Sequence, residues 1–110
     1  MTRQDVEAVA MALPAATKVV QWGGSDVFKV GGKVFAISGD EGVSFKVTEI
    51  AFEVLTSDGT GRQAPYCAKG QWVNVAHDHM TLEDCRGWLA TAHSLIAAKL
   101  TRKARAELGL

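Results

Sequence analysis

The chain has 110 residues, with twelve lysine and arginine residues against twelve aspartate and glutamate residues, and 47% of its side chains are hydrophobic. This composition is typical of a globular domain and excludes a disordered segment, which would be poor in apolar side chains and rich in charge. The net charge of zero lacks the strongly basic balance of many nucleic-acid binders. We therefore expect one domain over residues 1–110.

The N-terminal segment predicts an amphipathic helix that ends at a proline. Thr2 and Asp5 form a Thr-x-x-Asp start signal, and apolar residues follow at helical spacing as far as Leu13. Pro14 stops the helix, because proline lacks the backbone N–H and restrains the residue before it.

Four β-like runs follow, at residues 18–22, 26–30, 33–38 and 42–47. Glycine-rich turns separate them. Gly31-Gly32 is a two-residue hairpin signal, because glycine adopts positive φ without a steric penalty. The four runs therefore predict an antiparallel meander.

Side-chain alternation in the fourth run predicts which face of the sheet is buried. Val43, Phe45 and Val47 fall on one face, with Ser44 and Lys46 on the other. Because successive side chains of a strand point to opposite faces, we expect one face in the core and the other in water.

The segment after the meander predicts a short helix, a long loop and one more strand. Thr48 can cap a helix that runs through Leu55. Residues 57–65 are rich in turn formers, and a last strand is expected at residues 71–76.

The longest helix is expected from Leu82 to about Leu100. Thr81 repeats the Thr-x-x-Asp start signal, and an apolar stripe of helical period follows it. Thr101 is a candidate cap for a final short helix that ends at Gly109.

These elements predict an α+β fold in two layers, in which the N-terminal helix and the long C-terminal helix pack on one face of an antiparallel sheet. The side chains expected in the core are Val9, Leu13, Phe35, Phe45, Val47, Phe52, Trp88, Leu89, Leu95 and Ile96.

The sequence gives no sign of a membrane or export signal. No apolar run approaches the ~20 residues that span a bilayer, and Asp5 and Glu7 are acidic where a signal peptide would be basic and then apolar. Cys67 and Cys85 form no CxxC pair and are too few for a disulfide framework. We expect two reduced thiols in a cytoplasmic protein.

Several short motifs occur in an order that matches one protein family. They are Leu13-Pro14, Trp22-Gly23, the run from Phe28 to Ala36, Ala64-Pro65-Tyr66, the run from Lys69 to Val73, and the basic segment from Lys99 to Arg105. With these motifs the chain resembles the MmcQ/YjbR family over nearly its whole length.

The resemblance implies a two-layer fold with an antiparallel sheet, often compared to the frataxin-like arrangement, in a small bacterial protein. It implies no known activity, although family members are often labelled as DNA-binding proteins. The family commonly has Ser-Tyr where Ala92-His93 stands here, so any role of that tyrosine does not transfer to this chain.

His77 and His79 form the most tempting metal-binding pattern. A His-x-His pair at strand spacing puts two imidazoles on one side, as metal sites require. His93 or Cys85 would have to supply a third ligand from the following helix. A solvated turn between strand and helix explains the run equally well, and we assign no metal and no cofactor.

No catalytic constellation is apparent. Cys85 belongs to the apolar stripe of the long helix and Cys67 lies among Pro65, Tyr66 and Ala68, so nothing places either thiol beside a base. The glycine clusters match neither phosphate-binding loop pattern and are typical of turns. We expect a protein that is not an enzyme.

The leading functional hypothesis is a weak nucleic-acid-binding module. Basic side chains could contact phosphates while Trp22, Tyr66 and Trp72 stack on bases. Both tryptophans, however, are of a type that more often fills a core. The candidate residues are Lys29, Lys33, Arg62, Tyr66 and Lys69, with Arg102, Lys103 and Arg105 of the C-terminal segment.

The alternative is a protein-interaction or small-ligand-binding domain that uses residues 57–72. In this hypothesis Tyr66 and Trp72 form a recess beside the long loop, and the zero net charge favours it. A concave pocket beside the loop would support the alternative, and a continuous basic stripe would support nucleic acid.

Overall fold

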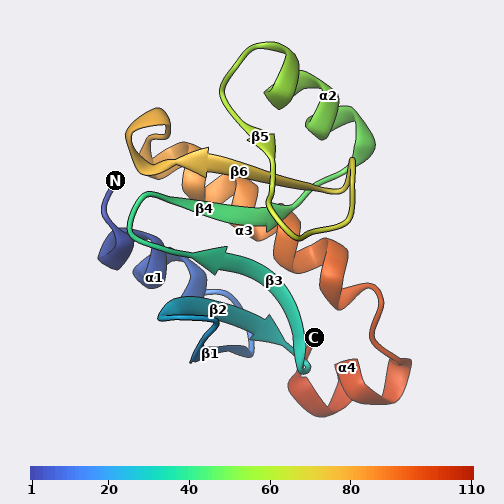
Figure 1. Ribbon diagram of the computed structural model, residues 1–110. Helices are drawn as coiled ribbons and strands as arrows, with labels where there is room; N and C mark the ends of the chain where they lie inside the picture. Colours follow the sequence, from blue (N-terminus) through green and yellow to red (C-terminus); the bar gives the residue numbers. More distant parts are fainter.

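The computed structural model describes residues 1–110 as a two-layer α+β fold, with an open sheet on one side and the N-terminal and longest helices on the other (Figure 1). The helices are α1 (Arg3–Met11), α2 (Glu49–Ser57), α3 (Leu82–Ala97) and α4 (Arg102–Leu108), with a short 3-10 helix η1 (His77–His79). The strands are β1 (Ala16–Gln21), β2 (Ser25–Val30), β3 (Lys33–Ser38), β4 (Gly42–Lys46), β5 (Arg62–Gln63) and β6 (Trp72–Ala76).

All strand pairs are antiparallel, in the order β1-β2-β3-β4-β6-β5. The first four strands are the predicted meander, and β3 has the predicted bounds. Gly31 and Gly32 adopt φ values of 58° and 79° in the turn between β2 and β3, as the hairpin signal requires. The sequence did not predict β5, a two-residue edge strand inside the long loop.

The helices begin at the predicted caps. The Thr2 hydroxyl accepts from the backbone N–H of Asp5, and the Asp5 carboxylate accepts from that of Thr2, so a full capping box opens α1. Thr81 and Asp84 make the same box at α3. Thr48 and Thr101 cap α2 and α4, and Gly109 ends α4 in the left-handed region.

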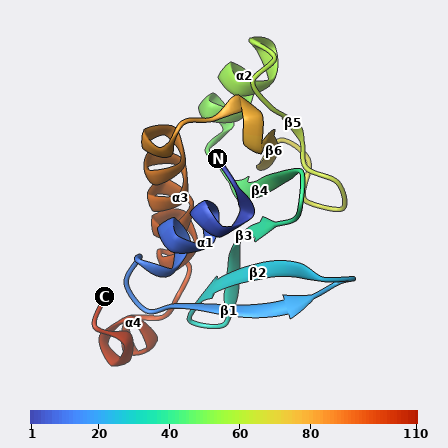
Figure 2. The same ribbon diagram turned by 90° about the vertical axis from the view of Figure 1, so that its left-hand side faces the viewer.

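The core lies between the sheet and the helices α1 and α3, which cover the same face (Figure 2). Phe28, Phe35 and Phe45 are fully buried, and Trp88 of α3 stacks on Phe45 with ring centroids 5.5 Å apart. A bulge between β2 and β3 leaves Phe35 without a cross-strand partner and turns it toward this core.

Half of the predicted core list is fully confirmed. Phe35, Phe45, Val47, Leu89 and Ile96 are buried, whereas the other five side chains are half-buried. Four of those five, which are Val9, Leu13, Phe52 and Trp88, still pack against the core cluster.

The prediction that Ser44 and Lys46 face water is wrong. Both keep only 8% of their surface exposed, although they leave β4 on the face opposite that of Phe45. Ser44 accepts a hydrogen bond from Asn74 on the neighbouring strand, and Lys46 donates to the Gln71 side chain. Burial and the nearby Lys99 lower the pKa of Lys46. The face opposite the helices, called the outer face below, is thus partly covered.

None of the helices combines the length and the apolar character that crossing a bilayer would need.

Gly42 allows close approach of β4 and β6 and gives a first testable prediction. A Cβ atom at this position would lie 2.5 Å from the Val75 carbonyl oxygen. Gly42→Ala should therefore lower the free energy of unfolding by about 1–3 kcal/mol, as overpacking does. Gly39→Ala is the matched control, because a Cβ there meets no atom within 4 Å. Equal stability of the two variants in urea unfolding would contradict the register of β4 and β6.

Candidate functional site

A cavity of about 720 Å³ lies on the outer face of the sheet. The β1–β2 turn, the β3–β4 turn and the loop after β5 surround it, and β3, β4 and β6 form its floor. Its lining residues are Trp22, Ser25, Ile37, Gly39, Asp40, Glu41, Gly42, Ser44, Arg62, Pro65, Tyr66, Cys67 and Asn74. Segments from both halves of the chain therefore build one site.

The floor of this outer-face cavity is fixed by strand register. Ile37 of β3 pairs with Ser44 of β4, Ser44 pairs with Asn74 of β6, and Asn74 pairs with Arg62 of β5. Paired residues of antiparallel strands share a face, so these four side chains form a row across the sheet. The Nδ2 atom of Asn74 donates to the Ser44 Oγ atom at 3.0 Å.

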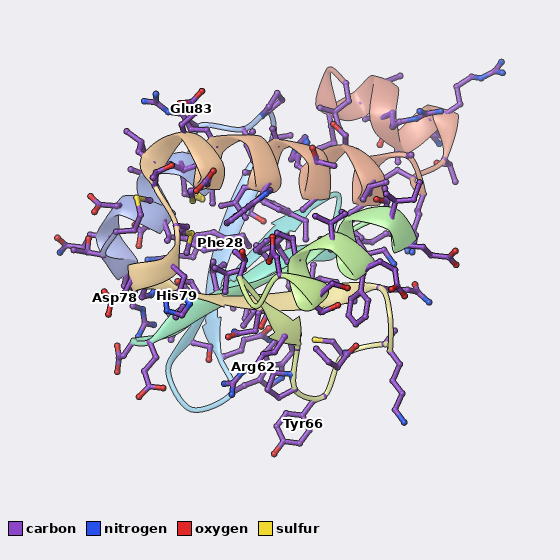
Figure 3. All side chains as sticks on the ribbon, turned by 90° about the horizontal axis from the view of Figure 1, so that it is seen from above. Phe28, Arg62, Tyr66, Asp78, His79 and Glu83 are labelled. Carbon is purple, nitrogen blue, oxygen red and sulfur yellow. The ribbon has the colours of Figure 1, made fainter.

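Two exposed aromatic residues line the cavity from opposite segments. Trp22 follows β1 and is 64% exposed, and Tyr66 of the loop after β5 is fully exposed. Figure 3 shows Tyr66 projecting away from the sheet, on the side opposite α3, with Arg62 near it. Neither ring is held in the core.

Both aromatic residues adopt backbone conformations that favour glycine. Trp22 has a φ of 50° and Tyr66 a φ of 62°, in the left-handed region. Such a conformation costs an L-residue roughly 1–2 kcal/mol, and strain of this kind is concentrated at ligand clamps and active sites. The fold therefore keeps two costly residues at the cavity without gaining core packing from them.

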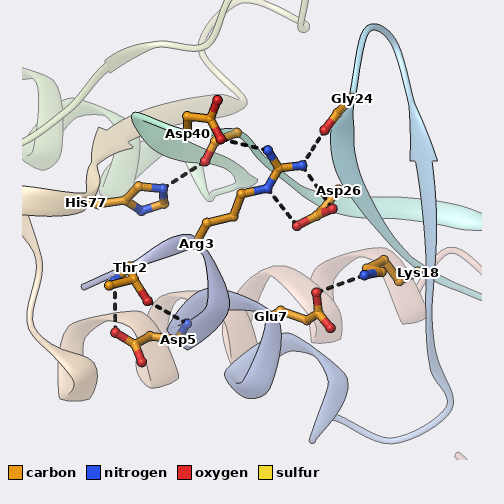
Figure 4. A network of polar contacts seen from close by, with 10 residues as sticks. Thr2, Arg3, Asp5, Glu7, Lys18, Gly24, Asp26, Asp40 and His77 are labelled. Atoms are coloured by element: carbon orange, nitrogen blue, oxygen red, sulfur yellow. Dashed lines mark hydrogen bonds and ion pairs between the residues drawn. The ribbon is translucent and has the colours of Figure 1, made fainter.

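Arg3 holds one side of the cavity in place (Figure 4). Its Nε atom lies 2.9 Å and one terminal nitrogen 3.0 Å from the two Asp26 carboxylate oxygens. The guanidinium also donates to the carbonyl oxygen of Gly24 and, at 2.9 Å, to Asp40. One side chain of α1 thus fixes both the β1–β2 turn and the β3–β4 turn.

His77, which directly follows β6, also fixes the β3–β4 turn. It is buried, and its Nε2 atom lies 2.9 Å from the carbonyl oxygen of Gly39. Its backbone N–H donates to the carbonyl oxygen of Glu41 at 2.9 Å. Asp40 and Glu41 are therefore presented to the cavity by a turn that is held on both sides.

Gln63 organises the loop that carries Tyr66. Its Nε2 atom donates to the carbonyl oxygens of Ala64 and Cys67, at 3.0 and 3.2 Å, and its Oε1 atom accepts from the backbone N–H of Gly70 at 2.9 Å. These bonds close the loop on itself, so Tyr66 stands on a shaped turn. Nothing in the sequence pattern singled out Gln63.

The structure brings only two of the eight predicted site residues together. Arg62 and Tyr66 line the outer-face cavity. Lys69 lines a separate depression beside the start of α2, together with Glu49 and Glu53.

The other five predicted residues lie outside the cavity lining. Lys29 is half-buried in β2 and Lys33 is exposed at the start of β3. The three basic residues of the C-terminal segment are exposed on α4, beyond the end of α3 and away from the labelled Arg62 and Tyr66 (Figure 3). Trp72, which the alternative hypothesis placed in the recess, is half-buried and does not line it. Trp22 takes that position.

Cys85, His77 and His93 are buried, whereas Cys67 is half-buried and His79 is exposed. Burial raises the pKa of Cys85 to about 11 and also raises the pKa of Cys67, which disfavours the reactive thiolate. His93 packs edge-on against Phe35 and contacts the carbonyl oxygen of Pro14 at 2.7 Å. His77 is buried and His79 exposed, and no group of three potential metal ligands forms.

The sequence from residue 11 to residue 95 matches the family model described as YjbR. The chain belongs to the YjbR family. This confirms the resemblance found in the sequence, and the family consists of small domains without an assigned activity.

Two solved structures share the fold. The Deinococcus radiodurans protein DR2400, with the domain DUF419, is 24% identical with a TM-score of 0.85, and the match covers 99% of this chain and 88% of that one. A protein from Pseudomonas syringae is 16% identical with a TM-score of 0.73, over 87% of this chain and 99% of that one. No protein of curated function matches the sequence.

The Arg3–Asp26 pair gives a prediction about acid stability. Hydrogen bonding to Arg3 lowers the pKa of Asp26 below its ordinary value of 3.8. A carboxyl group with a lowered folded-state pKa stabilises the fold above its unfolded-state pKa, and this stabilisation is lost as the pH falls through the folded-state value. Asp26→Asn should therefore destabilise the protein clearly at about pH 7 and progressively less below about pH 4.

Urea unfolding across this pH range measures the effect. Glu53→Gln is the control, because Glu53 is exposed and makes no ion pair. A stability difference for Asp26→Asn that stays constant down to about pH 2 would show that the charge of Asp26 contributes nothing.

Proposed function

We propose that this YjbR domain binds a small molecule in the outer-face cavity. The single observation that carries the proposal is a cavity of about 720 Å³ with exposed aromatic residues on two sides and polar groups on its floor. Ligand sites are typically concave, of roughly 300–1,000 Å³, with a few placed polar groups among apolar side chains.

The floor supports the proposal because it is rigid. Ser44 and Asn74 lie on neighbouring strands whose opposite faces, through Phe45 and Val73, belong to the core. Sites built on strands hold their geometry better than sites built on loops alone. The two turns and the loop around the floor are fixed by Arg3, His77 and Gln63 rather than by the core.

The proposed function is binding of a ligand without catalysis of a reaction. Cys67 is the one thiol in the lining, no histidine lines the cavity, and burial raises the pKa of Cys67. Nucleophilic catalysis by a thiol needs a lowered pKa and a nearby base. The cavity therefore supports recognition better than turnover.

Nucleic-acid binding has less support from the geometry. The basic residues proposed for it occupy at least three separate places, and Lys69 lies beside Glu49 and Glu53. Phosphate contacts gain most when cations are gathered along one face. We therefore rank the small-molecule proposal first.

The test is a screen of purified protein against a metabolite panel and against single- and double-stranded DNA and RNA, read by thermal shift. A partner that binds only the folded state raises the melting temperature. We expect a small-molecule hit, with NMR shift changes at Ile37, Ser44 and Asn74. The proposal is overturned by a nucleic-acid hit that weakens steeply with salt and leaves these three residues unchanged.

Tyr66→Ala should weaken binding of the hit while leaving stability nearly unchanged. Removing one aromatic contact should cost about 3- to 10-fold in affinity. Because Tyr66 is fully exposed, its loss should change the free energy of unfolding by less than about 0.5 kcal/mol. Ile50→Ala, which also truncates an exposed apolar residue but lies outside the cavity, is the control and should change neither quantity.

A further inference from the structure

We propose that the outer-face cavity takes a planar aromatic carboxylate, with Trp22 and Tyr66 contacting the ring system and Arg62 pairing with the carboxylate. This inference rests on the proposed function and names its ligand class. Three features of the cavity lead to it: the two aromatic side chains, an unpaired guanidinium, and the charge balance around it.

The two exposed aromatic side chains favour a planar ligand. Trp22 and Tyr66 come from segments far apart in the sequence, line one cavity, and leave most of their ring surface in water. Planar rings stack on such side chains with roughly 5-fold or greater gains in affinity per contact. A saturated ligand of the same size would fill the cavity but would lack the affinity gained by ring stacking.

Arg62 is the free cation of the cavity. It makes no ion pair and no side-chain hydrogen bond, whereas Arg3 is fully engaged by Asp26, Asp40 and Gly24. Arg62 is also exposed and stands on the edge strand β5, where its backbone is held by pairing to Asn74. The planar fork of a guanidinium matches a carboxylate through two parallel hydrogen bonds.

The charge balance limits how much negative charge a ligand can carry. Glu41 lines the same cavity and shares a neighbouring depression with Arg62. Asp40 also lines the cavity, and Arg3 is shared between Asp40 and Asp26, so it offsets only one of these two carboxylates. The surroundings of Arg62 are therefore net negative, and a dianionic phosphate would be opposed more strongly than a singly charged carboxylate.

The floor can recognise a polar atom on the ring. Asn74 donates to Ser44 through one amide N–H, which leaves its second N–H and its carbonyl oxygen for a ligand. The Ser44 hydroxyl can donate in turn, because it accepts from Asn74. A ring that carries one heteroatom or hydroxyl group would satisfy these groups.

The ligand class is tested by NMR titration of isotope-labelled protein with four compounds. These are naphthoate, its neutral amide naphthamide, the saturated decalin carboxylate, and adenosine monophosphate. We expect naphthoate to bind at least about 5-fold more tightly than either the amide or the saturated acid. The amide lacks the charge that pairs with Arg62, and the saturated acid lacks the ring that stacks on Trp22 and Tyr66. Adenosine monophosphate should bind more weakly than naphthoate, which distinguishes a carboxylate from a phosphate source.

Single substitutions test which residue makes each contact with the ligand. Trp22→Gly and Tyr66→Gly should each weaken naphthoate binding about 5-fold and keep the melting temperature, since glycine accepts the positive φ of both positions. Arg62→Gln should remove the preference for naphthoate over naphthamide, and Arg62→Lys should restore it in part. Glu41→Gln should strengthen naphthoate binding about 2-fold. Val54→Ala, on the exposed side of α2, is the control and should change nothing.

Each contrary result has a defined meaning. Equal binding of naphthoate and decalin carboxylate, or no binding by naphthoate, overturns the inference. If a non-aromatic metabolite then shifts the signals of Ser44 and Asn74, the proposed function stands with another ligand class. If no small molecule of the panel shifts them, both proposals fail. Tighter binding of a single-stranded oligonucleotide than of the mononucleotide would indicate a nucleic-acid surface instead.

Discussion

The guanidinium of Arg3 is the contact on which the shape of the outer face depends. It joins α1 to Asp26 at the start of β2, to Gly24 in the β1–β2 turn and to Asp40 in the β3–β4 turn. Asp26 is buried, and a buried carboxylate is stable only when it is paired and hydrogen-bonded. The N-terminal helix, which packs on the helical side, therefore also determines where the cavity's turns lie on the other side.

Local signals in the sequence were sufficient for most of the fold. The capping pairs at Thr2 and Thr81 and the Gly31-Gly32 turn each act through neighbouring residues, so the sequence alone could place those elements. The end of the first helix was predicted too late, because α1 ends at Met11, before Leu13 and Pro14. The two-residue strand β5 exists only because the loop pairs with β6. No local pattern predicts such a strand. The burial of Ser44 likewise depends on Asn74, thirty residues away.

The candidate site was predictable only in part. Arg62 and Tyr66 were selected for their residue type and their loop position, and both line the cavity. Trp22 was considered as a stacking aromatic but was not selected as a site residue, because a tryptophan more often fills a core. No sequence signal shows that a bulky residue will adopt positive φ. Lys69 was selected by the same reasoning as Arg62. The charge of a side chain in the sequence does not predict which cavity that side chain will line.

The core and the cavity lie on opposite faces of the sheet. Phe28, Phe35 and Phe45 are fully buried against the helices, whereas Trp22 and Tyr66 bury little and occupy costly backbone conformations. Substitutions around the cavity can therefore change its chemistry at small cost to the core, while the floor stays fixed by strands that the core holds. Ser44 is the exception, because it is a buried residue of the cavity floor. The next residue, Phe45, belongs to the core, and the Ser44 hydroxyl accepts a hydrogen bond from Asn74. A change at Ser44 must alter the packing of β4 and the cavity floor together. This coupling makes the floor a more constrained part of the site than the residues around it.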